Sequence, residues 1–150
     1  QGVRGKLGHG DQQLTQWEPK KIEAFAGQRV VAVSAGGGHS LAITADGSAW
    51  SWGSGFFGRL GHGDEQRQLL PKKVEAFTGR VVVVSAGDCH SLARTADGAL
   101  FAWGQGNRGC LGHGEDLSNQ LLPMTVAAWA LGKRGIAESL CTAGRAFIAA

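Results

Sequence analysis

Several residue types are scarce in this sequence, and each scarcity excludes a class of protein. The three cysteines lack a C-x-x-C spacing, so we expect neither a disulfide framework nor an oxidising compartment. No apolar run approaches the roughly 20 residues of a membrane span, so we expect no membrane partner. Three prolines and the lack of a G-x-y period exclude a collagen-like chain. The compartment we expect is the cytoplasm or the nucleus.

Glycine is the abundant exception, with 25 of 150 residues. Proteins average about 7% glycine, and the excess here accompanies tryptophans and short apolar runs. This composition indicates many tight turns between short strands. With 43% hydrophobic residues and a net charge of +3, the chain is typical of one soluble globular unit.

Segments of the chain recur at an interval of about 51 residues. SWGSGFFGRLGHGD at 51–64 returns as AWGQGNRGCLGHGE at 102–115, and its latter part also opens the chain. His39 and His90 are 51 residues apart. The chain begins at Gln1, inside this recurring motif, so we expect it to be an excerpt of a longer protein.

The repeat decides how Gly53–Gly58 is interpreted, because this string matches the G-x-G-x-x-G of phosphate-binding loops. In a dinucleotide-binding fold the pattern occurs once, follows a strand and opens a helix. Here it occurs twice and runs into Gly61 and His62, a poor start for a helix. Glu75 lies 20 residues beyond Gly55, as a ribose-binding acid would, but it belongs to another recurring segment. We interpret the glycines as turn residues and expect no cofactor.

Each period predicts about four short strands. Val30–Ser34 and Val81–Ser85 are apolar runs typical of strands buried on both faces. His39–Thr44 and Ser48–Gly53 follow, separated by an Asp-Gly hairpin turn. Pro71–Phe77 is predicted as an outer strand that begins at its proline. Four antiparallel strands per period, with no amphipathic helix, are typical of β-propeller blades.

Two longer motifs resemble the regulator-of-chromosome-condensation repeat family. VSAGGGHSLAI at 33–43 fits that repeat throughout, whereas VSAGDCHSLAR at 84–94 ends in Arg94, where an aliphatic residue is usual. D-G-x-x-x-x-W-G followed by G-x-x-G-x-L-G-H-G-D strengthens the resemblance, which covers roughly residues 1–126. The resemblance implies a seven-bladed propeller.

The fold class that we predict is all-β: a partial β-propeller of about two to three four-stranded antiparallel blades, with a ring that does not close within this chain. We therefore expect the remaining blades outside this chain, and we expect the isolated piece to be oligomeric or aggregation-prone. Two registers stay open at the C-terminus, with either Phe147 or Thr142 at the histidine position. The 150 residues form one partial domain, divided into an incomplete first repeat (1–28), a repeat (29–79), a repeat core (80–126) and a degenerate repeat (127–150).

Recurring side chains are interpreted as structural. Equivalent positions on neighbouring blades lie about 10 Å apart, too far for two imidazoles to share one zinc, so we expect no metal site. Cys89 and His90 point to opposite faces of a strand, and Ser40 and Ser91 lack a nucleophile elbow, so we expect no catalytic residue. The structural repeat positions are His39, His90, Trp52, Trp103, Gly61, His62, Gly112 and His113.

Dibasic pairs also recur, at Lys20-Lys21 and Lys72-Lys73. One interpretation is a cationic stripe that contacts DNA phosphates or an acidic protein. The other is that lysines on outer strands are solvated and prevent edge pairing. We favour the second, because the third copy reads Pro123-Met124-Thr125.

The function that we predict is a non-enzymatic protein-interaction scaffold, because every recurring motif is explained by blade construction. The family resemblance implies two alternatives. The first is guanine-nucleotide exchange on a small GTPase together with chromatin binding, and the second is the partner-binding region of a large HECT-type ubiquitin ligase. A plant ultraviolet photoreceptor also belongs to the family, but its Gly-Trp-Arg-His-Thr motif is absent here, and we expect Trp52 and Trp103 to be packed core aromatics.

Overall fold

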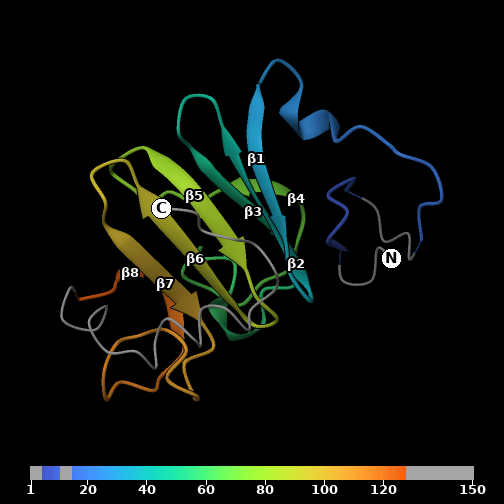
Figure 1. Ribbon diagram of the computed structural model, residues 1–150. Helices are drawn as coiled ribbons and strands as arrows, with labels where there is room; N and C mark the ends of the chain where they lie inside the picture. Colours follow the sequence, from blue (N-terminus) through green and yellow to red (C-terminus); the bar gives the residue numbers. More distant parts are fainter. Residues whose placement is uncertain (1–4, 11–14, 128–150) are drawn as a thin grey trace.

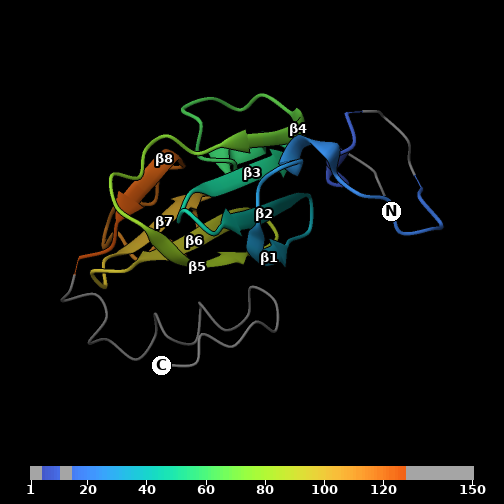
Figure 2. The same cartoon turned by 90° about the horizontal axis from the view of Figure 1, so that it is seen from above.

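Two four-stranded antiparallel sheets follow each other along the chain (Figure 1). The computed structural model describes residues 5–10 and 15–127. Figures 1 and 2 show the sheets side by side, with β5 against β1 and β2. Sheet A contains β1 (Val30–Ala35), β2 (His39–Thr44), β3 (Ala49–Gly53) and β4 (Gln68–Lys73). Sheet B contains β5 (Val81–Ala86), β6 (His90–Thr95), β7 (Leu100–Gly104) and β8 (Gln120–Thr125).

The two sheets share one register, as the sequence repeat requires. Val33 pairs with Ala42 in sheet A, and their counterparts Val84 and Ala93 pair in sheet B. Each first hairpin also has a bulge at the equivalent place, after Val30 and after Val81. The prediction of four-stranded antiparallel units without a closed ring is therefore confirmed.

The outer strand differs from its predicted bounds of Pro71–Phe77. β4 begins earlier, at Gln68, and ends at Lys73, although the Val74 N–H still donates to the Ala49 carbonyl of β3 at 2.9 Å. Val74 is buried between the sheets, and Phe77 packs against the ring of Trp103. Pro71 lies where the β3–β4 pairing is irregular, so the ladder does not need its missing N–H. The turns η2 (Glu23–Phe25) and η3 (Phe56–Gly58) are single 3-10 turns.

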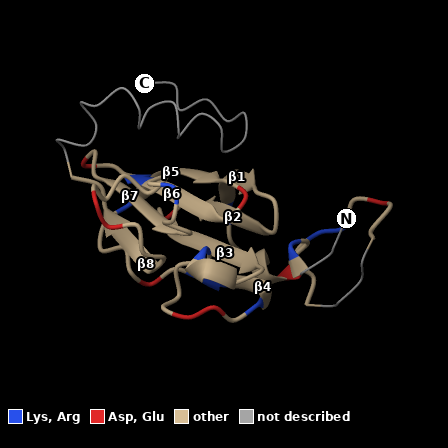
Figure 3. Ribbon diagram, turned by 90° about the horizontal axis from the view of Figure 1, so that it is seen from below, with Lys and Arg blue, Asp and Glu red and all other residues tan. Residues whose placement is uncertain are grey.

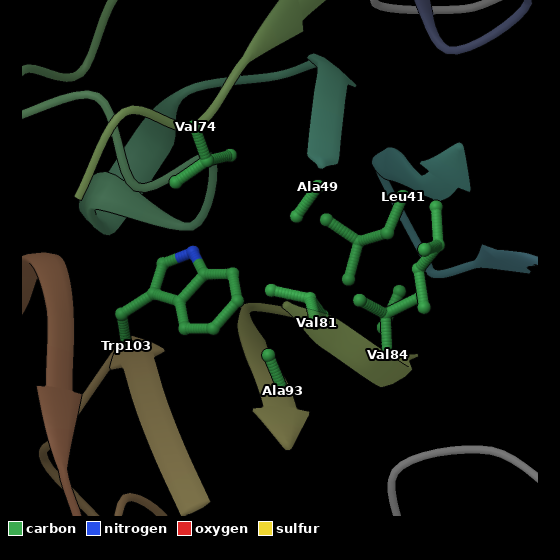
Figure 4. Close-up of a cluster of buried hydrophobic side chains, with 9 residues drawn as sticks. Leu41, Ala49, Val74, Val81, Val84, Ala93 and Trp103 are labelled. Carbon is green, nitrogen blue, oxygen red and sulfur yellow. The ribbon is translucent and has the colours of Figure 1, made fainter. Parts of the chain in front are cut away.

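The main core lies between the facing sides of the two sheets, an interface that we call the seam. Burial of apolar side chains from both sheets in this seam is the main force that holds sheet A and sheet B together. Trp103 has no exposed surface, and its indole lies edge-on to the Phe77 ring at 5.8 Å between centroids. Figure 4 shows the cluster: Leu41, Ile43 and Ala49 of sheet A, Val74 of the connection, and Val81, Val84, Ala86, Ala93 and Trp103 of sheet B.

The same aromatic arrangement recurs on the other side of sheet A. Phe25 lies edge-on to Trp50 and to Trp52, at 5.6 and 5.9 Å between ring centroids. Phe77 has the equivalent position beside Phe101 and Trp103. Each repeat therefore packs its tryptophan against a phenylalanine from the segment that precedes its first strand.

The turns between the first two strands of each sheet approach each other across the seam. A Cβ atom on Gly36 would lie 2.1 Å from the Gly87 carbonyl oxygen, so only glycine fits. The Gly37 N–H donates to the same carbonyl at 3.2 Å. This contact fixes the distance between the two turns.

We predict that Gly36→Ala lowers the free energy of unfolding by about 1–3 kcal/mol, because the new methyl group meets backbone of the other sheet. Gly79→Ala is the matched control, since its Cβ would meet Thr95 only at 3.9 Å. We expect the control to change stability by less than about 1 kcal/mol. Urea unfolding of both variants measures the difference, and equal losses would contradict this description of the turn.

Candidate functional site: the Gly/His loops and the seam

The Gly/His motif forms loops at residues 5–10, 54–63 and 105–114, and each of the first two is held by the sheet that follows it. The carbonyl oxygen of Arg59 accepts hydrogen bonds from the Trp103 indole at 2.9 Å and from the Ser91 hydroxyl at 2.8 Å. One repeat earlier, the Lys6 carbonyl accepts from Trp52 at 2.8 Å and from Ser40 at 2.9 Å. The tryptophan and the serine of each sheet are therefore anchors for the preceding loop.

This arrangement explains why Gly53–Gly58 is not a cradle for phosphate. The Ser54 N–H donates to the Gly38 carbonyl at 2.9 Å, and the Gly58 N–H donates to the Gly55 carbonyl at 2.9 Å. A phosphate-binding loop keeps such donors free for the ligand. Here carbonyls of the protein accept them, and η3 is a single turn.

The loop histidines bind their own sheet. His62 Nε2 lies 2.9 Å from the Ser51 hydroxyl oxygen, and that hydroxyl donates to the Leu60 carbonyl at 2.7 Å. Because the serine proton goes to Leu60, His62 is the donor to Ser51. The equivalent His113 donates from Nε2 to the Ala102 carbonyl at 3.3 Å. Burial lowers the pKa of His62.

His39 joins the two sheets across the seam. Its Nε2 lies 2.7 Å from the Ser91 hydroxyl oxygen, and both side chains are fully buried. Ser91 donates its only proton to the Arg59 carbonyl, so His39 carries a proton on Nε2 and donates it. The Nδ1 atom is buried without a hydrogen-bond partner.

A serine and a histidine at this distance match the first requirement of a nucleophile–base pair. The hydrogen bond between them, however, has the opposite direction to that of a catalytic pair. A catalytic histidine accepts the serine proton, whereas His39 donates to Ser91. Burial, followed by the charge of Arg59 and a contribution from His90, lowers the pKa of His39 to about 3. The pair is a neutral structural link between sheets.

Sequence reasoning missed Arg59, whose side chain is only 2% exposed. Its Nε donates to the Phe56 carbonyl at 2.9 Å and its Nη1 donates to the Asp88 carbonyl at 2.8 Å. The guanidinium also lies 5.6 Å from the ring centre of Phe57, a residue with a left-handed φ of 64°. Nothing in the repeat pattern indicates this role, because Lys6 and Cys110 occupy the equivalent positions.

The four lysines that the sequence singled out are exposed, and two of them line recesses in sheet A. Lys73 and Arg29 line one recess together with Trp50, and Lys21 lines the other, which is mostly apolar. Gln28 lines both recesses, which are therefore adjacent. A binding role for Lys20, Lys21, Lys72 and Lys73 stays a prediction.

The recess lined by Arg29 and Lys73 is also lined by an acid, Asp46. Hydrogen bonds from Thr44 and Ser48 lower the pKa of Asp46 to about 2, so this carboxyl is ionised at neutral pH. Figure 3 likewise shows acidic segments among the basic ones on the side that it displays. The surface beside Lys73 is therefore mixed in charge, not a continuous cationic stripe.

Residues 5–10 and 15–127 hold no group of three or more His, Cys, Asp or Glu side chains suited to a metal ion. Over the same ranges, no helix has the length and apolar character needed to cross a membrane. Cys89 and Cys110 are half-buried free thiols, and Cys141 lies outside the described residues. The positions that distinguish the two registers expected at the C-terminus, Thr142 and Phe147, also lie outside the described residues.

Comparison with known proteins identifies the repeat. The Regulator of chromosome condensation (RCC1) repeat matches residues 1–43, 46–94 and 97–133, and a second form of it matches 30–59 and 81–110. The chain is 46% identical over 113 residues to the Homo sapiens E3 ubiquitin-protein ligase HERC2, which covers 73% of this chain and 2% of HERC2. It is 41% identical over 128 residues to the Ultraviolet-B receptor UVR8 of Arabidopsis thaliana, covering 85% of this chain and 29% of UVR8.

A solved structure has the same arrangement of strands. Prp20p from Saccharomyces cerevisiae, described with its binding properties to Gsp1p and histones, aligns with a TM-score of 0.63 and 25% identity. The alignment covers 69% of this chain and 26% of Prp20p. The chain thus spans less than a third of the length of each of these three proteins.

We predict that His39 makes the protein less stable in mild acid. Its folded-state pKa of about 3 lies below the unfolded value of 6.5, so the unfolded state binds the extra proton between these values. The stability provided by neutral His39 is complete above pH 6.5 and is lost as the pH falls toward 3. The loss approaches about 1.4 kcal/mol per pH unit for one proton.

His39→Gln is the matched variant, because an amide N–H can replace Nε2 and does not titrate. Urea unfolding from pH 7 to pH 5 should show the wild type losing stability faster than this variant. The comparison removes contributions common to both proteins, such as that of His62. A constant difference between wild type and variant over this range would contradict the prediction.

Proposed function

The chain belongs to the regulator of chromosome condensation repeat family, and from this premise we propose that it is a non-enzymatic protein-interaction module. It provides blades of a propeller whose loops and outer rim bind a protein partner. Catalysis in a longer protein that contains this segment would come from another domain.

The observation that carries the proposal is that recurring polar side chains of both sheets form hydrogen bonds inside the structure. The Trp103 indole and the Ser91 hydroxyl hold a loop, His39 links two sheets, and His62 binds a serine hydroxyl. None of these groups is left to act on a substrate. In a repeat protein, a surface that differs between repeats is where partner selection can reside.

Exposed positions differ strongly between the two sheets. On the outer strand, Lys72 and Lys73 of sheet A are replaced by Met124 and Thr125 of sheet B, and Met124 is 44% exposed. On the loops, the exposed Phe56 has Asn107 as its counterpart. Exposed apolar side chains that gather on one rim are typical of protein-binding surfaces. Those of β8 and its preceding loop are Leu117, Leu121, Leu122 and Met124. Leu121 and Leu122 repeat the leucines of β4, whereas Leu117 and Met124 replace charged residues of the first repeat.

The similar proteins support an interaction role over a single reaction. One is named a ubiquitin-protein ligase, one is named an ultraviolet-B receptor, and one is described by its binding to Gsp1p and histones. A fold shared by such different activities supplies binding surfaces, and the specific function depends on the residues placed on them.

Guanine-nucleotide exchange with chromatin binding is the second candidate. It is favoured by the likeness to Prp20p, described with Gsp1p and histones, and by acidic loop residues that suit a basic partner. Glu65, Glu115 and Asp116 are exposed on or beside the Gly/His loops. The likeness to HERC2 favours a third candidate, a partner-binding region of a large ubiquitin ligase.

We predict that the full-length protein containing this segment binds its partners through the rim of sheet B. Replacing Leu122 and Met124 by glutamate should reduce recovery of crosslinked partners by at least about tenfold. Val31→Glu is the control, because Val31 is 54% exposed but lies on β1, away from the rim. Equal recovery with the rim variant and the wild type would contradict the assignment.

A release assay separates the first two candidates. We expect the full-length protein not to accelerate nucleotide release from a panel of small GTPases. Acceleration would replace our proposal with the exchange-factor candidate.

A further inference from the structure

The tip of the loop at residues 54–63 carries an exposed aromatic side chain that blade construction does not explain. Phe56 is 56% exposed, although the Gly/His loops before and after it in the chain and both sheets are present. Its counterpart in the loop at 105–114 is Asn107. The repeat therefore does not require an aromatic residue at this position.

The turn that contains Phe56 lies against the outer strand of the next sheet. η3 contacts β8, and a Cβ atom on Gly58 would lie 2.6 Å from the Cα atom of Leu121. The Gly63 N–H also donates to the Leu121 carbonyl at 3.0 Å, so the loop backbone lies directly on this strand. Leu121 and Leu122 are both exposed. Together with Phe56 they form an apolar patch built from two consecutive repeats.

The exposure of these leucines does not come from a missing neighbour. Leu70 of sheet A is the counterpart of Leu122, and it is 50% exposed with its preceding loop and sheet B in place. Gly10 of that preceding loop lies against Leu70, as Gly63 lies against Leu122. The outer strand of an assembled repeat therefore keeps this leucine accessible to a partner.

The backbone that presents Phe56 is strained. Phe57 has a left-handed φ of 64°, and it is the one non-glycine residue with such a φ among residues 5–10 and 15–127. Its counterpart Arg108 does not have this conformation. An aromatic residue adopts it only where the surrounding structure imposes it, and such strain is common at binding sites.

Arg59 supplies the contacts that hold this conformation. Its Nε donates to the Phe56 carbonyl at 2.9 Å, and its guanidinium lies 5.6 Å from the centre of the Phe57 ring. Its Nη1 donates to the Asp88 carbonyl at 2.8 Å and so ties the loop to sheet B. Cys110, the counterpart of Arg59, cannot make these contacts. Because Arg59 is buried, it acts as a positioning residue for Phe56.

The exposed charges around Phe56 are mainly negative. Glu65 lies across the loop, where a Cβ atom on Gly55 would be 2.5 Å from the Glu65 carbonyl oxygen, and Asp88 lies on the adjacent turn of sheet B. Both acids are exposed, and Arg67 is the one exposed cation between η3 and β4. A cation can stack on the face of an aromatic ring and pair with nearby carboxylates. This arrangement suits a basic partner segment.

We propose that Phe56 is the anchor for a basic segment of a partner protein, with Arg59 as its positioning residue. An arginine or lysine of that segment lies over the Phe56 ring, within reach of Glu65 and Asp88. An adjacent apolar side chain of the segment covers the exposed leucines of β8. This role rests on the proposed interaction function and specifies which partners it selects.

Peptide selection with the full-length protein that contains this segment tests the proposal. A library of displayed random peptides is selected for binding, and the binders are titrated against variants by fluorescence anisotropy. We expect binders rich in arginine, lysine and apolar residues, whose affinity falls at least about tenfold in Phe56→Ser. Asn107→Ser, at the equivalent position of the next loop, is the matched control and should leave their affinity unchanged. Glu65→Lys should also weaken binding, whereas Glu75→Lys, an exposed acid beyond the other end of β4, should not.

The positioning role of Arg59 has its own variants. Arg59→Lys keeps the charge but loses the planar group over Phe57, so we expect the same peptides to bind at least about threefold more weakly. Phe57→Gly removes the need for that contact, because glycine adopts a left-handed φ readily. The double variant Arg59→Lys/Phe57→Gly should therefore bind more tightly than Arg59→Lys alone. Urea unfolding checks that each variant is folded, and a purely structural role would lower stability without this rescue of binding.

The proposal fails if no peptide is selected, if the selected peptides are acidic, or if they bind Phe56→Ser as tightly as the wild type. Equal binding by Arg59→Lys and the wild type would remove the positioning role. If replacing Leu122 and Met124 by glutamate loses partners while Phe56→Ser keeps them, the interaction module stands and the Phe56 anchor does not.

Discussion

One backbone carbonyl in each of the first two Gly/His loops depends on the neighbouring sheet for its hydrogen bonds. The carbonyls of Lys6 and Arg59 accept from the indole and the hydroxyl of the sheet that follows. A buried carbonyl that loses its partners costs about 1–3 kcal/mol. Loop and sheet therefore stabilise each other only when two consecutive repeats are assembled.

The apolar core has the same dependence. The residues that exclude water around Trp103 come from both sheets and from the segment that connects them. The close approach of Gly36 to the Gly87 carbonyl then fixes how near the two units can come. A stack built in this way is stabilised mainly by contacts between neighbours, as expected for repeat proteins.

Much of this architecture could be predicted from the sequence, because glycine turns and strand runs recur at a fixed interval. His39 and Trp103 were identified as structural positions, yet their partners were not, since hydrogen bonds across the seam join residues far apart in the chain. Ser91 was considered only as a nucleophile, although its repetition at 51 residues was a signal for a structural role. The predicted end of the outer strand at Phe77 was wrong, since β4 ends at Lys73 and only the Val74 N–H continues the pairing, to the Ala49 carbonyl. Arg59 could not be found, since its position is not constant between repeats.

A double-mutant cycle across the seam tests the dependence of one repeat on the next most directly. Leu41→Ala in sheet A and Val84→Ala in sheet B both remove side chains from the shared core. The cycle should give a coupling free energy above about 0.5 kcal/mol, whereas Leu41→Ala combined with Leu92→Ala on the far side of sheet B should be additive. Additive effects for the first pair would show that the two sheets fold independently and would contradict the account.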